Sequence, residues 1–170
     1  MLTRAISATA MTNARRAIAD IARSNGARRE LAPVTDEDAG PGDVQRLSRE
    51  ECLQLLASRR VGRFAHVESA RALAVVPVNY VVQPDGSVLF RTGPGPKLSA
   101  AERQDVVAFE VDDIDEDHHT GWSVLVTGRA HRLSHAEAHK VADLPQPWAN
   151  GPRYQFVLIE PTRIEGRRLT

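Results

Sequence analysis

The sequence predicts a mainly β fold of the α+β class, arranged as an antiparallel barrel or sandwich. Short runs of β-branched and aromatic residues follow one another closely from residue 61 to residue 159, with turn residues between them. Only short segments of helical character separate these runs, which argues against a doubly wound α/β fold with its longer alternating helices. The 170 residues are enough for one domain with a substantial core.

The helices are predicted from a Ser-x-x-Glu spacing that occurs three times. In this capping box, the serine and glutamate side chains cap the first turn of a helix. After the first box, Cys52, Leu53, Leu55 and Leu56 form an apolar face, which indicates a short helix at one end of the barrel. The predicted helices cover residues 48–59, begin at residue 99 directly after Lys97, and cover residues 134–143.

The strands are predicted from alternating residues, most clearly in the stretch Val75 to Leu98, VVPVNYVVQPDGSVLFRTGPGPKL. Alternation on both sides of the Pro84-Asp85-Gly86 turn indicates a β-hairpin. The predicted strands cover residues 61–67, the two arms of this hairpin, residues 106–111 and 122–131 joined by an acidic loop, and residues 154–159.

The hairpin ends in a glycine-rich bend that carries cations. Arg91 and Thr92 lead into Gly93-Pro94-Gly95-Pro96, and Lys97 follows. Glycines let the backbone approach a ligand closely, and arginine and lysine favour a phosphate group. The residues alone leave two interpretations open, which are an anion site and solvated cations at the end of a strand.

The overall charge indicates no charged partner. Lys plus Arg and Asp plus Glu both number 22, so no net charge attracts nucleic acid or a membrane surface. Cys52 is the single cysteine, which excludes an internal disulfide or a cysteine-based metal site and favours the cytoplasm. No apolar run approaches the roughly 20 residues needed to span a bilayer. We therefore expect a cytoplasmic protein with neither nucleic-acid nor membrane partners.

An acidic stretch of the sequence is interpreted as a solvated loop, and we predict no metal site. Asp113, Asp115 and Asp117 have the spacing that opens a calcium-binding EF-hand loop. However, the sixth position is His118 where that loop needs glycine, and the twelfth is Val124 where it needs glutamate.

The first 44 residues are predicted to be an N-terminal extension and linker, and residues 45–170 to be the folded domain. Residues 1–29 are rich in Ala and Arg, which allows an amphipathic targeting helix or an extension that begins before a true start at Met11. Residues 33–44, PVTDEDAGPGDV, are typical of a linker.

Four segments, in this order and spacing, resemble the pyridoxamine 5′-phosphate oxidase-like family of flavin-binding split barrels. They are LSREECLQLLASRRVGRFA, VVPVNYVV, LFRTGPGPKL and VAFEVDDIDEDHHTGWSVLVTGRA. The resemblance extends over residues 47–169. It implies a six-stranded antiparallel Greek-key split β-barrel with short peripheral helices, and a homodimer with a flavin at the subunit interface.

The resemblance also implies which residues bind the cofactor, FMN. One group holds the phosphate, a second lies along the edge of the isoalloxazine ring, and a third meets the cofactor, in many members from the partner subunit. The group that holds the phosphate is Arg91, Thr92 and Lys97. The group along the edge of the ring is Pro77, Val78 and Asn79, and the third group is Trp122 and Ser123.

The implied function is an FMN-dependent oxidoreductase acting on a small molecule that the sequence does not identify. A deazaflavin-dependent reductase and a non-catalytic flavin or haem carrier or sensor are the alternatives. Pro96 departs from the family pattern because it removes a backbone N–H before Lys97. The C-terminal TRIEGRRLT lacks the Arg-and-His motif of vitamin B6 synthesis, and no catalytic acid or base is assigned.

Overall fold

The computed structural model describes residues 44–69, 72–138 and 153–169, with residues 140, 145, 148 and 151. The predicted N-terminal extension lies outside the described residues, except for Val44. No helix in the described part of the chain is long and apolar enough to cross a membrane.

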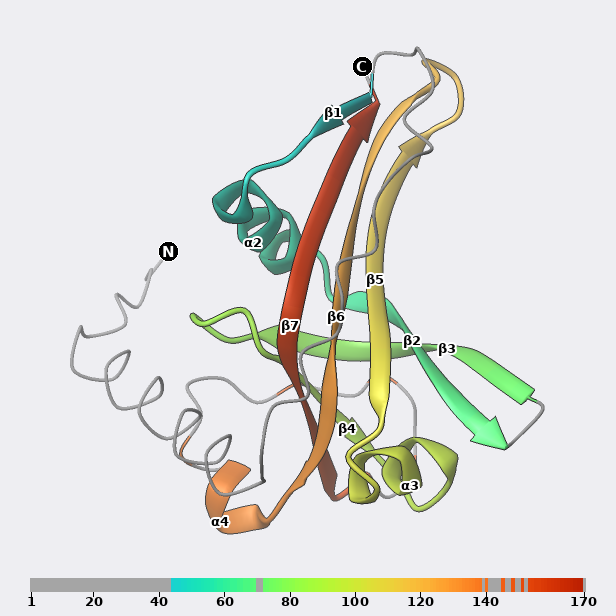
Figure 1. Ribbon diagram of the computed structural model, residues 1–170, viewed down its shortest axis with the longest axis vertical. Helices are drawn as coiled ribbons and strands as arrows, with labels where there is room; N and C mark the ends of the chain where they lie inside the picture. Colours follow the sequence, from blue (N-terminus) through green and yellow to red (C-terminus); the bar gives the residue numbers. More distant parts are fainter. Residues whose placement is uncertain are drawn as a thin grey trace.

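The described residues form one antiparallel sheet of seven strands in the order β1-β7-β4-β3-β2-β5-β6. Because β6 also pairs with β7, six strands close into a barrel, and β1 adds to the end of β7 (Figure 1). This confirms the predicted antiparallel barrel. The strands are β1 (Val44–Arg46), β2 (Val61–Ser69), β3 (Ala72–Val82), β4 (Val88–Thr92), β5 (Val106–Asp115), β6 (Thr120–Leu133) and β7 (Gln155–Leu169).

The last strand is much longer than the sequence predicted. We expected it to end at Ile159. Pro161 follows two residues later, and proline cannot donate to a sheet ladder. The structure accommodates Pro161 opposite Gly128, where the register between β6 and β7 shifts, and β7 then continues to Leu169. A β-bulge is one of the few places where a strand tolerates proline.

The hairpin of β5 and β6 is also longer than predicted, and the acidic loop is correspondingly shorter. Asp112, Asp113 and Asp115 lie within β5. Arg63 forms an ion pair with Asp112 at 2.7 Å, and Arg59 pairs with Asp113, so neighbouring cations balance two of the three acids. The sequence pattern could not show these pairs because the partners lie about fifty positions apart.

Helix α2 (Arg49–Ser58) begins where the capping box predicted. The Ser48 hydroxyl accepts a hydrogen bond from the Glu51 N–H at 3.3 Å, and the Glu51 carboxylate accepts one from the Ser48 N–H at 2.8 Å. The Tyr80 hydroxyl donates to the Leu56 carbonyl and joins α2 to β3. Burial raises the pKa of the Tyr80 phenol, which therefore stays a donor.

Helix α3 (Pro96–Glu102) begins earlier than predicted. Its N-cap is Gly95, with φ of 139°, and Pro96 starts the first turn, so Ser99 lies inside the helix. The fixed φ of proline suits the first helical position. Helix α4 (His135–Ala138) is capped by Ser134, whose N–H donates to Glu137 at 2.8 Å. Except for Lys140, the rest of this predicted helix lies outside the described residues.

The sheet has an inner face that holds the core and an outer face that is partly apolar. Phe64, Phe90 and Phe109 are fully buried inside the barrel. On the outer face, Leu73 is 80% exposed and Val75 is 62% exposed, and β2 and β5 add apolar neighbours. We name this surface the outer apolar patch; its residues are Ala65, Val67, Leu73, Val75, Val106 and Ala108.

Candidate functional site

The strands β3 and β4 diverge at the predicted phosphate and ring residues. The two strands pair from Val82↔Val88 to Tyr80↔Phe90. Beyond Tyr80, β3 pairs with β2, with Asn79 opposite Val61 and Pro77 opposite Arg63. Beyond Phe90, β4 pairs with β7, where Arg91 lies opposite Phe156. We call this divergence the split of the barrel. Beyond Tyr80 and Phe90, the facing edges of β3 and β4 are no longer paired with each other.

The backbone of Asn79 faces this split. The Tyr80 N–H donates to the Arg60 carbonyl on the β2 side at 3.2 Å. Because backbone groups of successive strand residues point to opposite edges, the N–H and C=O of Asn79 point toward β4. These groups can therefore form hydrogen bonds with the polar edge of a flat ligand in the split.

The Asn79 side chain is held by two backbone groups of the protein. Its carbonyl oxygen accepts from the Trp148 N–H at 2.9 Å, and its amide nitrogen donates to the Arg60 carbonyl at 3.4 Å. Pro77 lies exposed on the same outer face, whereas the neighbouring Val78 is buried in the core. If Val78 contributes to a ligand site as predicted, it does so through its backbone or through packing.

Arg91 is half-buried on the outer face, on the β4 side of the split. Its Nε–H donates to the Arg153 carbonyl at 2.9 Å, and its guanidinium lies 5.4 Å from the centre of the Phe156 ring. Among the described residues, Arg91 has no carboxylate partner. The structure thus fixes the side chain while leaving its charge available for an anion.

Thr92 and Lys97 follow on the path from β4 into α3. Thr92 is buried at the end of β4, and Lys97 is half-buried in the first turn of α3. Within the described part of the chain, Lys97 forms no ion pair. The structure therefore places Arg91, Thr92 and Lys97 along one short stretch at the α3 end of the barrel.

Trp122 and Ser123 are the third and fourth residues of β6, close to the turn of the β5–β6 hairpin. This turn lies at the end of the molecule opposite α3 (Figure 1). Ser123 pairs with Arg167 of β7, and Arg91 pairs with Phe156 of the same strand. These β7 residues are eleven positions apart, a path of roughly 36 Å at about 3.3 Å per residue. One chain alone does not bring the two groups of predicted cofactor residues together.

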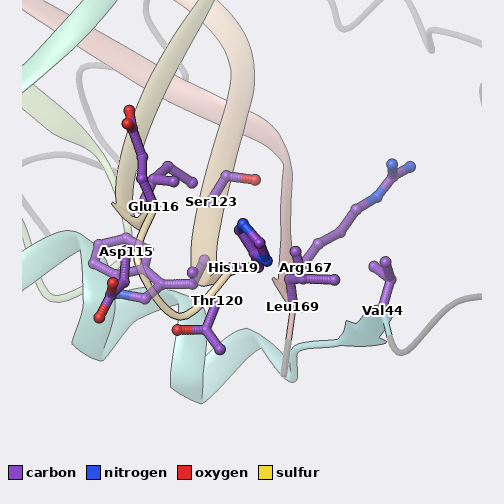
Figure 2. Close-up of a pocket in the computed structure, with 11 residues that line it drawn as sticks. Val44, Asp115, Glu116, His119, Thr120, Ser123, Arg167 and Leu169 are labelled. Carbon is purple, nitrogen blue, oxygen red and sulfur yellow. The ribbon is translucent and has the colours of Figure 1, made fainter.

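A pocket of about 540 Å³ lies beside Ser123 (Figure 2). We name it the hairpin pocket. It is formed by β1, the β5–β6 hairpin and the end of β7, and Trp122 and Ser123 are among its lining residues. Most of its walls are apolar, and its other residues include Val44, Ile114, Asp115, Glu116, His119 and Leu169.

A charged cluster lies on the outer face between the split and the hairpin. Arg63, opposite Pro77, forms ion pairs with Glu110 at 2.9 Å and Asp112 at 2.7 Å. Burial and the neighbouring Asp112 carboxylate raise the pKa of Glu110, against the opposing effect of Arg63. The cation of this cluster, Arg63, lies directly opposite Pro77, which is one of the predicted ring residues. The two carboxylates lie on β5, on the other side of Arg63.

Sequence reasoning missed the hairpin pocket and the Arg63 cluster. The pocket joins residues near both ends of the described chain, and its β7 wall lies beyond the point where we expected that strand to end. The alternation of β2 and β5 was a usable signal for Arg63 and Glu110, because it places both on the outer face. It did not fix the register that makes them neighbours.

Comparisons with known proteins agree with this architecture. The sequence profile described as pyridoxamine 5′-phosphate oxidase matches residues 48–168. The uncharacterized protein Rv0080 of Mycobacterium tuberculosis is 40% identical over 133 residues, which cover 75% of this chain and 86% of that protein.

Two solved structures are similar to this chain. The FAD binding protein from Mycobacterium smegmatis is 35% identical, with a TM-score of 0.56, and the match covers 75% of this chain and 99% of that one. A FAD-binding protein from Mesorhizobium loti has a TM-score of 0.59, and the match covers 75% of this chain and 99% of that one. Its sequence identity of 23% supports the fold alone.

A closed antiparallel barrel that splits between two strands, with a basic stretch beside the split, defines the class of flavin-binding split barrels. The chain belongs to the pyridoxamine 5′-phosphate oxidase-like family of flavin-binding proteins.

Proposed function

We propose that this protein is a flavin-dependent oxidoreductase that binds FMN, or the FMN portion of a larger flavin, at the split between β3 and β4. The observation that carries this proposal is the arrangement of Arg91, Lys97 and Asn79 around the split. The substrate would be a small organic molecule.

The residues at the split fit the two chemically different parts of the cofactor. A phosphate group needs cations, and Arg91 and Lys97 have no carboxylate partner among the described residues. A flat ring needs apolar walls and a few hydrogen bonds at its polar edge. Pro77 and the outer apolar patch offer such a wall, and the backbone of Asn79 faces the split with a donor and an acceptor.

We further propose that two chains form a homodimer through their outer faces. The outer apolar patch would be covered by the second chain, since exposed apolar surfaces of this kind mark interaction sites. A two-fold axis that crosses the strands would place the hairpin of one chain over the α3 end of the other. The turn of the hairpin carries Glu116 and Asp117, with Arg167 of β7 near it, and the opposite end carries Arg91 and Lys97, so the acidic turn of one chain would face basic residues of the other.

In such a dimer, Ser123 and Trp122 of one chain would meet the cofactor held by the other. The flavin, when bound, supplies hydride or electron transfer at its ring. The chain's own contribution is to hold the phosphate, to orient the ring against β3 and to exclude water through the second chain. Glu110 lies on β5, two strands away from Pro77 and ion-paired with Arg63, so it belongs to the charged surroundings of the proposed ring site.

Visible absorption spectra and a phosphate-site double variant test the proposal. Wild-type protein with FMN should show the two-banded flavin spectrum and micromolar or tighter affinity. Each charged phosphate contact contributes about 1.5–3 kcal/mol, so Arg91→Ala/Lys97→Ala should weaken FMN binding more than about 100-fold.

A matched control removes the same two charges elsewhere, as Arg49→Ala/Lys140→Ala, and should bind FMN as the wild type does. Unchanged FMN affinity in the Arg91→Ala/Lys97→Ala variant would disprove the phosphate assignment. Selective uptake of a deazaflavin by the wild type, with no uptake of FMN, would reassign the cofactor.

A further inference from the structure

We propose that the hairpin pocket binds the adenosine portion of a nucleotide ligand. The inference rests on the proposed function, because the proposed dimer would place this pocket beside the phosphate residues of the other chain. A flavin or reductant that carries adenosine could then extend from the split of one chain into the hairpin pocket of the other.

The size and the walls of the pocket suit a purine nucleoside. Its volume of about 540 Å³ lies within the roughly 300–1,000 Å³ typical of small-molecule sites. Val44, Ile114 and Leu169, all partly exposed, provide apolar surfaces from three different strands, against which a flat heterocycle can lie.

His119 offers a planar partner for the base. Figure 2 shows its imidazole between Ser123 and the side chains of Arg167 and Val44. The backbone of His119 has a φ of 52°, which is a left-handed conformation. This conformation is uncommon for residues other than glycine, although histidine adopts it more often than most. An imidazole can stack on a base, and such stacking contributes about 1–3 kcal/mol per base.

The rim of the pocket carries the carboxylates of Asp115 and Glu116 together with the guanidinium of Arg167, so it offers hydrogen-bond acceptors to a nucleoside. Asp115 is held by His118, whose N–H donates to it at 3.1 Å and whose ring Nδ1 lies 2.8 Å from the second oxygen. Glu116 follows in the chain and also lines the pocket. Carboxylates accept hydrogen bonds from ribose hydroxyls and from amino groups of bases, but they repel phosphates.

In the proposed dimer, the phosphates of the ligand would lie between Arg167 at the rim of the pocket and Arg91 and Lys97 of the partner chain. Two ligands share the required chemistry, which are FAD and a nicotinamide nucleotide used as reductant. Both carry an adenosine joined to a pyrophosphate.

Titration of adenosine, followed by protein NMR chemical shifts, tests the pocket without any flavin. Adenosine should shift resonances of the β5–β6 hairpin, and uridine should bind at least several-fold more weakly because it has the smaller base. His119→Asn removes the ring but tolerates the same backbone conformation, and should weaken adenosine binding at least 5-fold. His135→Asn, an exposed histidine on α4 and outside the lining, is the matched control and should change it less than 2-fold.

Cofactor titrations on the same proteins then separate the two sources of adenosine. A preference of the wild type for FAD over FMN that His119→Asn abolishes identifies FAD. A raised KM for NADPH or NADH with an unchanged FAD-to-FMN ratio identifies the reductant.

Failure of the pocket inference and failure of the proposed function give different results in these experiments. Adenosine binding that is absent, or equal in the wild type and His119→Asn, overturns the pocket inference even when FMN binds normally. Wild-type protein that binds neither FMN nor FAD overturns the proposed function, whereas adenosine binding that depends on His119 would still support the pocket.

Discussion

The hydrogen bonds between Ser48 and Glu51 fix the start of α2. They also make the stability of this end of the helix depend on pH. The N–H of Ser48, and secondly its hydroxyl, donate to the Glu51 carboxylate and lower the pKa of Glu51. A lowered pKa means that the folded state favours the charged carboxylate. The stabilisation is therefore present above the ordinary glutamate pKa and is lost as the pH falls through the lower folded value.

Replacing the cap should reveal this pH dependence. Ser48→Ala should lower the free energy of unfolding by about 1 kcal/mol at pH 7. Ser48→Ala keeps the backbone N–H and loses the hydroxyl, so the part of the difference that comes from the hydroxyl–carboxylate hydrogen bond should shrink as the pH falls through the lowered pKa of Glu51. Urea unfolding at pH 7 and at a series of lower pH values measures it. Ser58→Ala, in the same helix and with no carboxylate partner, should show a difference that does not vary with pH; equal behaviour of the two variants would contradict the assignment.

Among the strands, the pairing of β6 with β7 depends on the absence of a side chain at Gly128. A Cβ at this position would lie 2.1 Å from the backbone oxygen of Glu160, directly before Pro161. Backbone cannot move aside as a flexible side chain can. The bulge that admits Pro161 into β7 therefore needs glycine opposite it.

Gly128→Ala should consequently destabilise the protein by about 1–3 kcal/mol or more, because β6 and β7 must separate. Thermal unfolding measures the effect. Thr127→Ala, the neighbouring substitution, places no new atom against β7 and should cost less. A Gly128→Ala protein as stable as the wild type would show that the bulge can rearrange.

The sequence predicted those elements whose signals are local. Alternation identified β2 and the β3–β4 hairpin, and the capping box located α2, because both patterns span only a few residues. The second half of β7 was missed because Pro161 interrupts its pattern, and only the distant Gly128 explains why the strand continues. Arg91, Thr92 and Lys97 were recognisable as a group because they are neighbours in the chain, although their role in binding stays a prediction. The hairpin pocket has no such local signal.

For the whole molecule, the proposed dimer makes the outer apolar patch the decisive surface. Leu73 is 80% exposed, so a charge there should cost the single chain little. In a dimer, the same charge would be buried without a partner, which is strongly unfavourable.

Leu73→Asp should therefore convert the dimer to a monomer in sedimentation experiments without lowering the thermal stability of the single chain greatly. It should also weaken flavin binding, since Ser123 of the second chain would be lost from the site. Gln54→Asp places the same charge on the exposed side of α2 and should leave the dimer intact. A Leu73→Asp protein that stays dimeric would place the interface elsewhere.

In the proposed dimer, the distance between the α3 end and the hairpin end within one chain would make cofactor binding and self-association thermodynamically linked. If each site needs two chains, the flavin binds the dimer more tightly than the monomer, and by reciprocity it strengthens the dimer by the same factor. The apparent flavin affinity would then rise with protein concentration until the chain is fully associated. In this sense the cofactor and the second chain act as ligands of each other.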